Sequence, residues 1–405
     1  MTLLPSGWRE VPLSSVAEVR LGRQRSPKNH LGEQMRPYVR AANVDWSGLR
    51  LDDIKFMNFS DSELSTYRLE PGDLLLGEAS GSPHEVGKPA IWRGEIYDCA
   101  FQNTLIRVRP MGPDPEYLLH YFRHQALTGR FAAAARGVGI RHLGSDALAK
   151  WRLPLPPLAE QRRIAEVLDR SNALRAKRRE ALALLDDLTQ SIFLDMFGSW
   201  AQMRQRWRIA RLVDVCLPEG GIKCGPFGTQ LAKSEFRKEG VPLWGIKDVN
   251  CSFRLLAREF VDACTAERLE QFSIIPGDII MTRKGTVGNC AVYPDAYPAG
   301  LMHSDLLRLR PKLDNVDVTF FAFQLQHSSD IAWQLSLISG GAVMPGVNVS
   351  RLSGLEVVVP PMAHQVMFAD RAKGVALQRD HQLAADIDNA SLLASLQQRA
   401  FSGQL

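Results

Sequence analysis

The chain has 405 residues, of which 45% are hydrophobic and 23% are charged, and its formal net charge is +5. Such a composition is typical of a soluble globular protein of two or three domains, and the mildly basic balance permits nucleic acid as a partner without demanding it. No apolar run approaches the ~18–20 residues that a membrane helix needs, and the N-terminus lacks the basic region and apolar core of a signal peptide. The six cysteines include no Cys-x-x-Cys pair, which predicts reduced thiols in a cytosolic protein.

Residues 1–155 form a first block of short apolar stretches rich in Val, Ile and Leu. Pro-Gly-Asp turns and glycine-containing loops separate these stretches, as expected of strands and turns. A helix is predicted near residues 117–130. The block is therefore expected to mix strands and helices.

A long charged segment, residues 156–198, comes next. Its two leading prolines fix an extended start, and a helix of about 40 residues, about 60 Å long, is expected to follow. Alternating steps of three and four residues predict a coiled-coil seam at Ile164, Val167, Ser171, Leu174, Arg178, Ala181, Leu185, Leu188 and Ile192. Gly198 is expected to end this helix, and residues 200–206 are expected to link it to the second half.

Residues 199–359 repeat the pattern of the first block, with a helix predicted near residues 318–337, and residues 360–405 again begin with two prolines and continue as a helix. The second helical stripe is less regular, because Gly374 and Arg379 interrupt it. Its apolar positions are Phe368, Ala372, Val375, Leu383, Ile387, Ala390 and Leu393. Two similar helices in one chain are expected to pair antiparallel, which would hold the two blocks apart and relate them by a pseudo-twofold axis.

The two halves of the chain repeat one another weakly in identity but in the same order. An offset of 204 residues separates the two Pro-Pro helix starts, and 205 residues separate the Pro-Gly-Asp turns at residues 71–73 and 276–278. Small differences in offset are what loop insertions on a shared scaffold produce. The sequence therefore predicts an α/β (α+β) fold of two similar domains separated by two long antiparallel helices, and a function that also comes in two halves.

Motifs for catalysis are missing from the sequence. The stretch 81–88 has the wrong spacing for a Walker A loop, and there is no His-Glu-x-x-His zinc motif and no Asn-Pro-Pro-aromatic motif of amino methyltransferases. Asp53-Ile54-Lys55 has the Asp-x-Lys form with which nucleases hold magnesium, but it has no counterpart in the second half and is more simply a surface pair. The sequence therefore predicts no catalytic residue and no metal site.

Basic and polar loops lie at matching points of the two halves: 21–30, 78–84 and 136–142 match 221–230, 282–286 and 340–345. Arg and Lys can neutralise phosphates or bond guanine, and Asn, Ser and His can bond base edges. The candidate DNA-binding residues are Arg23, Arg25, Lys28, Arg40, Asn43, Ser82, His84, Lys88, Arg136, Arg141, His142, Lys223, Phe227, Lys247, Arg283, Lys284 and His303. Taken singly, each loop can also be an ordinary solvated loop. The first long helix also carries a basic run, which is either a solvated face or a stretch that passes over DNA phosphates: Arg170, Arg175, Lys177, Arg178 and Arg179.

At residues 156–169, Pro-Pro-Leu-Ala-Glu-Gln-Arg-Arg-Ile-Ala-Glu-Val-Leu-Asp, the chain resembles the specificity subunit of type I restriction-modification systems. The opening at residues 5–13 and the Gly-Pro-Phe-Gly-Thr-Gln-Leu stretch at residues 225–231 resemble the family's first and second target recognition domains, so the resemblance covers the whole chain. One departure is His364, which stands where the first helix has Glu160. The second helix start is therefore expected to be degraded relative to the first.

The resemblance implies target recognition domains at residues 1–155 and 199–359 and helical spacers at residues 156–198 and 360–405. It implies a non-catalytic, cytoplasmic subunit whose two domains each read one half of a bipartite, asymmetric site in double-stranded DNA. The helices would dock two modification subunits, which bind S-adenosylmethionine and methylate adenine, and two restriction subunits using ATP and Mg can join, while this chain binds no cofactor. The residues assigned to subunit docking are Ile164, Leu168, Leu174, Leu185, Ile192, Phe368, Leu383 and Ile387.

Two functions of other classes also fit parts of the sequence. A non-catalytic interaction scaffold would use the helices as a coiled-coil spacer and the domains to bind protein or glycan. A stand-alone nuclease would use Asp53 and Lys55 to hold magnesium. Salt-sensitive binding to duplex DNA distinguishes a recognition subunit from a scaffold, because phosphate contacts release counterions.

Overall fold

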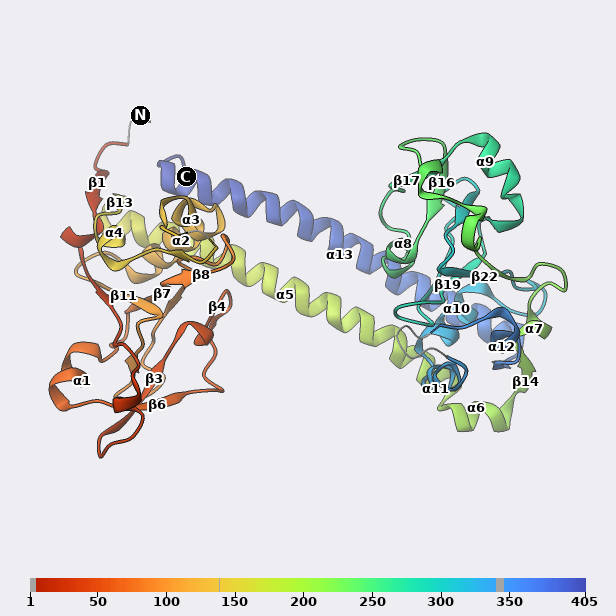
Figure 1. Cartoon of the computed structure of the whole chain (residues 1–405), viewed down its shortest axis with the longest axis horizontal. Coiled ribbons are helices and arrows are strands. Elements are labelled where there is room, and N and C mark those ends of the chain that lie inside the picture. Colours follow the sequence, from red (N-terminus) through yellow and green to blue (C-terminus); the bar gives the residue numbers. More distant parts are fainter. Residues whose placement is uncertain (1–4, 138, 340–345) are drawn as a thin grey trace. The chain divides into compact units, whose positions relative to one another are not determined.

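The computed structural model describes residues 5–137, 139–339 and 346–405 (Figure 1). The chain divides into two compact units, Met1–Arg179 with Ala384–Leu405, and Glu180–Leu383. The boundaries pass through both long helices, α5 (Leu158–Phe197) and α13 (Met362–Ser402). Each unit therefore contains one block together with one half of each long helix.

The elements of the first block are short. Its strands are β1 (Arg9–Pro12), β2 (Ala17–Leu21), β3 (Met35–Val39), β4 (Val44–Asp45), β5 (Gly48–Leu49), β6 (Lys55–Asn58), β7 (Leu74–Gly77), β8 (Ala79–Ser80), β9 (Pro89–Ile91), β10 (Ala100–Phe101), β11 (Leu105–Pro110), β12 (Arg141–His142) and β13 (Arg152–Leu155). Its α-helices are α1 (Asp61–Tyr67), α2 (Pro115–Leu127), α3 (Arg130–Ala134) and α4 (Ser145–Ala149), and its 3-10 helices are Leu13–Ser15, Pro27–Asn29 and Ala41–Asn43.

The second block has a matching series of elements. Its strands are β14 (Arg208–Arg211), β15 (Ile222–Cys224), β16 (Val241–Trp244), β17 (Glu259–Val261), β18 (Ser273–Ile274), β19 (Ile279–Thr282), β20 (Cys290–Val292), β21 (Gly300–Met302), β22 (Leu306–Leu309) and β23 (Glu356–Val359). Its α-helices are α6 (Trp200–Arg206), α7 (Leu212–Val215), α8 (Ile246–Asn250), α9 (Ala263–Arg268), α10 (Val318–His327), α11 (Ser329–Ile338) and α12 (Val349–Ser353), and its 3-10 helices are Gly228–Gln230, Lys233–Glu235 and Glu270–Phe272.

Two sheets organise the first block. A four-stranded antiparallel sheet has the order β2-β11-β7-β9, and a three-stranded sheet has the order β10-β3-β6, in which β10 runs parallel to β3. β7 is buried on both faces because its side chains alternate: Leu74 and Leu76 join the core beneath α2, whereas Leu75 joins a separate cluster between the sheets. β1 pairs with β13 and places the end of the block at the start of α5.

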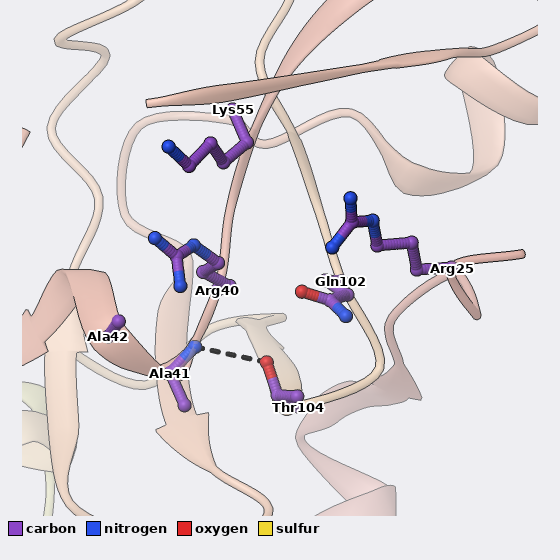
Figure 2. Close-up of a pocket in the computed structure, with 7 residues that line it drawn as sticks. All are labelled: Arg25, Arg40, Ala41, Ala42, Lys55, Gln102 and Thr104. Carbon is purple, nitrogen blue, oxygen red and sulfur yellow. Dashed lines mark hydrogen bonds between the residues drawn. The ribbon is translucent and has the colours of Figure 1, made fainter. Parts of the chain in front are cut away.

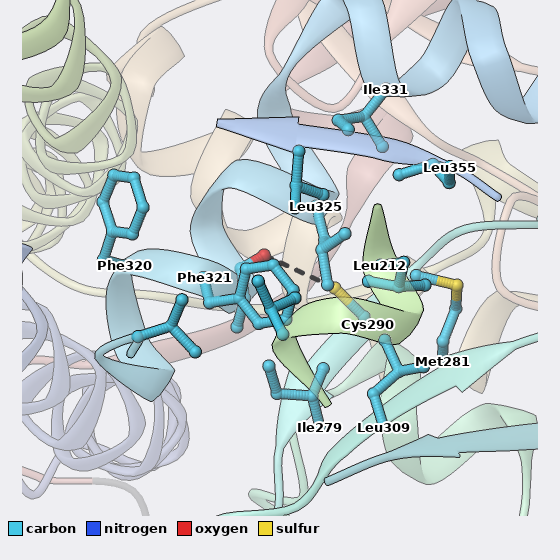
Figure 3. Packing of buried hydrophobic residues seen from close by; sticks show 14 of the residues in the cluster. Leu212, Ile279, Met281, Cys290, Leu309, Phe320, Phe321, Leu325, Ile331 and Leu355 are labelled. Atoms are coloured by element: carbon cyan, nitrogen blue, oxygen red, sulfur yellow. Dashed lines mark hydrogen bonds between the residues drawn. The ribbon is translucent and has the colours of Figure 1, made fainter. Parts of the chain in front are cut away.

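The second block has a similar topology, with one strand more, β18, in its second sheet. Its sheets have the orders β15-β22-β19-β20 and β17-β16-β21-β18, and β16 runs parallel to β21 as β3 does to β10. β14 pairs with β23 as β1 pairs with β13. β19 alternates as β7 does: Ile279 and Met281 lie in the main core (Figure 3), whereas Ile280 lies in the second cluster. The predicted α+β fold and internal duplication are confirmed.

The duplication extends to buried polar groups at the Pro-Gly-Asp turns. The Arg109 guanidinium donates to both carboxylate oxygens of Asp73 at 2.7 and 2.8 Å, and that of Arg310 to both oxygens of Asp278 at 2.6 and 2.7 Å. Both aspartates are 1% exposed, and each also accepts the backbone N–H of the residue three positions earlier. The repeated motif thus fixes a strand connection in each block.

Within each unit the two long helices run antiparallel, as predicted. In the first unit Arg163 donates to the Leu405 carbonyl at 3.0 Å, and Arg178, further along α5, donates to the earlier Ala385 carbonyl at 2.7 Å. In the second unit Arg379 of α13 pairs with Asp186 of α5 at 3.1 Å. Each block therefore packs on the first half of the long helix that follows it in the sequence and on the last half of the other long helix.

Aromatic residues fasten the far end of each helix to a block. In the first unit the ring of Phe401 on α13 lies 5.8 Å from Tyr117 and 5.4 Å from Tyr121 of α2. In the second unit the ring of Phe197 on α5 lies 4.9 Å from Phe320 of α10. These rings continue the block cores, so residues distant in sequence complete each domain.

Two local predictions need correction. Gly198, with φ of +75°, ends α5 as expected, but the predicted linker of residues 200–206 is itself a helix, α6, because Ser199 and Gln202 form a capping box and Met203 is buried. The single helix predicted near residues 318–337 is two helices. Ser328 ends α10, and its hydroxyl accepts the N–H of Ile331 and so starts α11.

The predicted seam of α5 is only partly right. The inward positions follow Ile164, Leu168, Ser171, Arg175, Arg178, Leu182, Leu185, Thr189, Ile192 and Met196. Leu174 and Leu188, predicted to face inward, are 46% and 44% exposed. Three successive inward positions, from Ser171 to Arg178, are polar. A seam predicted from apolar residues therefore includes leucines that lie on the outer face of the helix.

The second helix is more regular than its sequence predicted. Its inward positions follow Gln365, Phe368, Ala372, Val375, Arg379, Gln382, Asp386, Asn389, Leu393, Leu396 and Ala400. Arg379 faces inward to bond Asp186, and Gly374 lies on the exposed side, so neither interrupts the line. The side chains of Ile387 and Ala390 lie outside the described residues.

A buried glutamine anchors the start of each long helix. The Gln161 side chain accepts the N–H of Asp114 at 2.8 Å and donates to the Pro156 carbonyl at 2.8 Å. Gln365 repeats the arrangement, accepting the N–H of Asp317 at 2.9 Å and donating to a proline carbonyl at 2.6 Å. Because the two aspartates cap α2 and α10, one amide joins each long helix to a block helix.

The second helix start is therefore not degraded by His364, contrary to the prediction. Glu160, its counterpart, bonds only Arg163 one turn further along at 2.7 Å. This exposed pair contributes at most about 0.5 kcal/mol. The anchoring group is the adjacent glutamine, which both helices keep.

Replacing either Gln161 or Gln365 by Ala should lower the free energy of unfolding by about 2 kcal/mol, since buried partners lose their hydrogen bonds. Chemical denaturation followed by circular dichroism measures the change. Gln398→Ala, at an exposed position of α13, is the control and should change stability by less than about 0.5 kcal/mol. Equal effects of all three variants would contradict an anchoring role.

In the described part of the chain, no helix combines the length and the apolar character needed to cross a membrane.

Candidate nucleic-acid interface

Strand direction gathers basic residues at one edge of the first block. Because β3 and β10 run parallel, Arg40 after β3 and Gln102 after β10 lie at the same edge. β6 runs antiparallel to β3 and begins there with Lys55. Figure 2 shows the cavity of about 330 Å³ that these residues line together with Arg25 and Thr104.

The cavity is lined by basic side chains, and a carboxylate lies beside two of them. Asp53 lies 2.6 Å from the Arg40 guanidinium and 2.6 Å from the Lys55 ammonium. The hydrogen bond from Lys55, together with the charge of Arg40, lowers the pKa of Asp53, so the carboxylate is ionised at neutral pH. Thr104 accepts the Ala41 N–H at 3.0 Å, which holds the loop after β3 against the loop after β10. The edge offers charged and amide groups suited to phosphate oxygens and base edges.

The second block builds a comparable edge from different residues. Lys247 lies in α8, directly after β16, and His303 follows the parallel strand β21. Lys284, after β19, pairs with Asp305 at 2.9 Å, and His303 lies 3.5 Å from the same carboxylate. Burial opposes ionisation of Asp305, but the bond and charge of Lys284 outweigh it and lower the pKa of Asp305.

Arg283 and Phe227 form a stacked pair in the second block. The guanidinium lies 4.7 Å from the centre of the Phe227 ring, which is 54% exposed, and it donates to the Cys224 sulfur at 2.8 Å. Burial raises the pKa of the Cys224 thiol, although Arg283 opposes the change. The pair presents a flat cationic surface against which a base or sugar can pack.

A further pair of predicted loops meets in the first block. β8 and β12 pair, which brings residues 78–84 beside residues 136–142, with Val138 outside the described residues. His142 lies 3.0 Å from Glu78, and Arg141 donates to the Ala132 carbonyl at 2.7 Å. The exposed candidates of these loops are Ser82, His84, Arg136 and His142, of which His142 is the one paired with Glu78.

Two predicted DNA-binding residues are structural instead. Asn43 is 3% exposed, and its amide bonds the backbone of Arg40, Arg50 and Asp53, so no group is left to reach a base. Arg23 pairs with Glu63 at 2.5 Å with its guanidinium over an aromatic ring. Both side chains shape the loops around the edge, and we remove them from the proposed contact set.

The remaining lysine candidates differ in whether their ammonium group already has a partner within the chain. Lys28 is exposed, Lys88 pairs with Glu85 at 3.2 Å, and Lys223 donates to Gln271 at 3.0 Å. The predicted loop of residues 340–345 lies outside the described residues.

Sequence reasoning missed Gln102 and Thr104 at the first edge and assigned Lys55 only to a nuclease motif. The available signal was positional, because each of the three lies at or next to the end of a predicted strand: Lys55 begins β6, Gln102 follows β10, and Thr104 precedes β11. In the described ranges, His, Cys, Asp and Glu side chains nowhere gather in a group of three that could hold a metal ion.

Comparisons with known proteins agree with this architecture. The family described as type I restriction modification DNA specificity domain matches residues 5–183 and 207–374. The StySPI specificity subunit of Salmonella potsdam is 21% identical over 99% of this chain and 90% of its own length. The EcoKI specificity subunit of Escherichia coli (strain K12) is 22% identical with the same coverage.

Among solved structures, a chain from a study of assembly of the type I R-M system is 20% identical, covers 100% of both chains and has a TM-score of 0.64. At this identity the match supports the fold alone. The sequence match in each half, together with the duplicated architecture, assigns the family. This chain belongs to the type I restriction-modification DNA specificity family.

Proposed function

We propose that this chain is the DNA-recognition subunit of a type I restriction-modification complex and that each block, as a target recognition domain, reads one half of a bipartite, asymmetric site. The subunit itself is not catalytic. Catalysis belongs to partner subunits, and the complex acts in the cytoplasm.

The observation that carries the proposal is a conserved framework with divergent edges. Both blocks keep the ion pair between an arginine and a buried aspartate, and both keep the glutamine anchor. The loop that holds Gln102 and Thr104 in the first block nevertheless holds His303 and Asp305 in the second. An amide and a hydroxyl differ from an imidazole and a carboxylate in the bonds they offer to base edges. Two equal scaffolds with different edges suit two different half-sites.

The remaining parts of the complex follow from the family resemblance. We propose that two modification subunits bind S-adenosylmethionine and methylate adenine, and that two restriction subunits using ATP and Mg can join them. This chain would bind double-stranded DNA and hold the subunits without a cofactor of its own.

Methylation sequencing tests the function directly. In a strain with no other specificity subunit, deleting this gene should abolish one bipartite adenine-methylation motif, and restoring the gene should return it. Persistence of every such motif would contradict the proposal. A scaffold function would instead leave the complex unable to bind duplex DNA even at low salt.

The structure changes the residues proposed for subunit docking. Ile164, Leu168 and Phe368 are fully buried in the block cores, so they position the helices and cannot meet a partner. Leu185, Ile192 and Leu383 are half-buried. The side chain of Ile387 lies outside the described residues. Among the predicted residues with described side chains, Leu174 is the exposed one.

Exposed leucines mark a better docking face in the second unit. Leu184 and Leu188 are 62% and 44% exposed and, with Leu185, line a groove of about 480 Å³ whose other wall is Gln378 and Gln382 of α13. Covering this apolar surface would be favourable, at about 1.5–3 kcal/mol per leucine. We propose this groove as part of the contact with a modification subunit.

Replacing Leu184 and Leu188 together by Asp should weaken assembly with the modification subunit by at least about a hundredfold, because the contact loses about 3 kcal/mol or more of apolar burial. The unfolding midpoint should not change, since both side chains are exposed. Analytical ultracentrifugation of the purified subunits measures the assembly.

The matched control places Asp at Leu255 and Leu256, which are comparably exposed at 50% and 77% but lie in the second block. This variant should assemble normally. Equal loss of assembly in both double variants would contradict a specific docking groove.

A further inference from the structure

One carboxylate holds two candidate DNA contacts in the first target recognition domain. The oxygens of Asp53 bond Arg40 and Lys55 separately, at 2.6 Å each, and both cations line the cavity at the strand edge. The Asp53 side chain is 54% exposed, so it meets the same solvent that an approaching DNA strand would displace.

The second domain has the same device at another position. Asp305 lies 2.9 Å from Lys284 and 3.5 Å from His303. It occupies the position that Thr104 has in the first block, on the loop that leads into the central strand of the sheet. Two domains with different edge residues therefore each place a carboxylate between two potential DNA contacts.

Stability does not account for these pairs. An exposed or partly exposed ion pair adds little to stability, because water screens its charges and ordering the side chains costs entropy. Their consequence for DNA is larger, because phosphate charge supplies nearly all of non-specific binding and each neutralised phosphate releases a counterion. A carboxylate that already bonds cationic side chains must be displaced or shared before they can bind phosphates, and it repels those phosphates itself.

We propose that Asp53 and Asp305 are specificity-determining residues, each of which engages two candidate DNA-contact residues of its own domain and withholds them from non-cognate DNA. The proposal rests on the DNA-recognition function proposed above. On a cognate half-site, base contacts at the edge compensate for separating the ion pairs. On any other sequence the phosphates alone cannot recruit the cations, so discrimination between sequences increases at little cost to correct binding.

Substitution of each carboxylate by its amide tests the proposal in the complex with modification subunits. Three duplexes are compared: the methylated motif found by sequencing, the same duplex with the first half-site scrambled, and the same duplex with the second half-site scrambled. Asp53→Asn should bind the duplex scrambled in the half-site of its own domain about tenfold more tightly than the unaltered complex. It should bind the intact motif within about threefold, and its affinity should fall more steeply with salt.

Asp305→Asn should give the same gain only for the duplex scrambled in the other half-site. The two variants thus control for one another. Asp52→Asn is a third control, because Asp52 is exposed and, in the part of the chain that the structure describes, forms no ion pair. It removes the same formal charge one residue away and should change affinity by less than about twofold.

Each other outcome overturns the inference. Loss of affinity for the intact motif in Asp53→Asn would mean that the carboxylate accepts a bond from a base instead. An equal gain for Asp52→Asn would reduce the effect to general charge. If the unaltered complex discriminates among the duplexes but the variants match it, the carboxylates have no such role. If the unaltered complex does not discriminate, the recognition function fails as well.

Discussion

Exchanging the first target recognition domain for that of a relative should change one half of the recognised sequence and leave the other half unchanged. Each base pair that a domain reads incorrectly costs about 1–3 kcal/mol, so a half-site of several pairs should lose binding by more than about a thousandfold. Sequencing of methylated adenine in a strain carrying only the exchanged chain gives the new motif.

The structure determines how the exchange has to be made. The first unit includes the last residues of α13, where Leu393, Ala400 and Phe401 pack into the core beneath α2. A graft of residues 5–155 alone would meet a foreign helix end at that core. Residues 384–405 should therefore come from the same donor, while Gln161 keeps its bond to the N-cap residue of α2.

The reciprocal exchange of residues 207–359 is the control and should change only the other half of the motif. A change in both halves after either exchange would mean that the domains do not read independently. A change in the spacer alone would place the effect on the helices.

Removing the partly exposed arginine that bonds the buried aspartate of either Pro-Gly-Asp turn should be the most destabilising single change proposed. Arg109→Met leaves Asp73, which is 1% exposed, without its bidentate partner, and a buried charge that loses its partner costs about 3–5 kcal/mol. The bond to Asp73 also raises the pKa of Arg109, as expected for a cation held by a carboxylate. Arg310→Met should act similarly through Asp278.

Thermal and chemical unfolding measure this loss. The double variant Arg109→Met with Asp73→Asn is the matched control, because a neutral amide can still accept the Glu70 N–H while carrying no buried charge. It should recover more than half of the lost stability. A cost below about 1 kcal/mol for Arg109→Met alone would show that water reaches Asp73 and solvates it.

The helical part of the fold was partly predictable. The prolines, the charge pattern and Gly198 predicted where α5 begins and ends, because these signals act through the local backbone. The inward face was not predictable in the same way. Leu174 and Leu188 have the apolar character of a seam but face outward. Arg379 faces inward, because Asp186 of α5 accepts its hydrogen bond.

The candidate interface was predictable as a set of loops but not residue by residue. Arg25, Arg40 and Lys247 lie at strand edges as exposed or half-buried cations, whereas Asn43 is enclosed by backbone groups of its own loop. A polar residue in a loop has the same sequence signal in both cases. Only the surrounding backbone determines whether its hydrogen-bonding groups are already used.

The sequence by itself determined the duplication, the two long helices and the family, because repeated order, proline starts and helical periodicity are properties of the chain read locally. Only the tertiary structure decided what the repeated residues do. It assigned anchoring to Gln161 and Gln365 rather than to Glu160, and it placed Asp53 and Asp305 each between two candidate DNA-contact residues. The physical reason is that hydrogen bonds and ion pairs depend on distance in space, and strand pairing brings together residues that lie far apart in sequence.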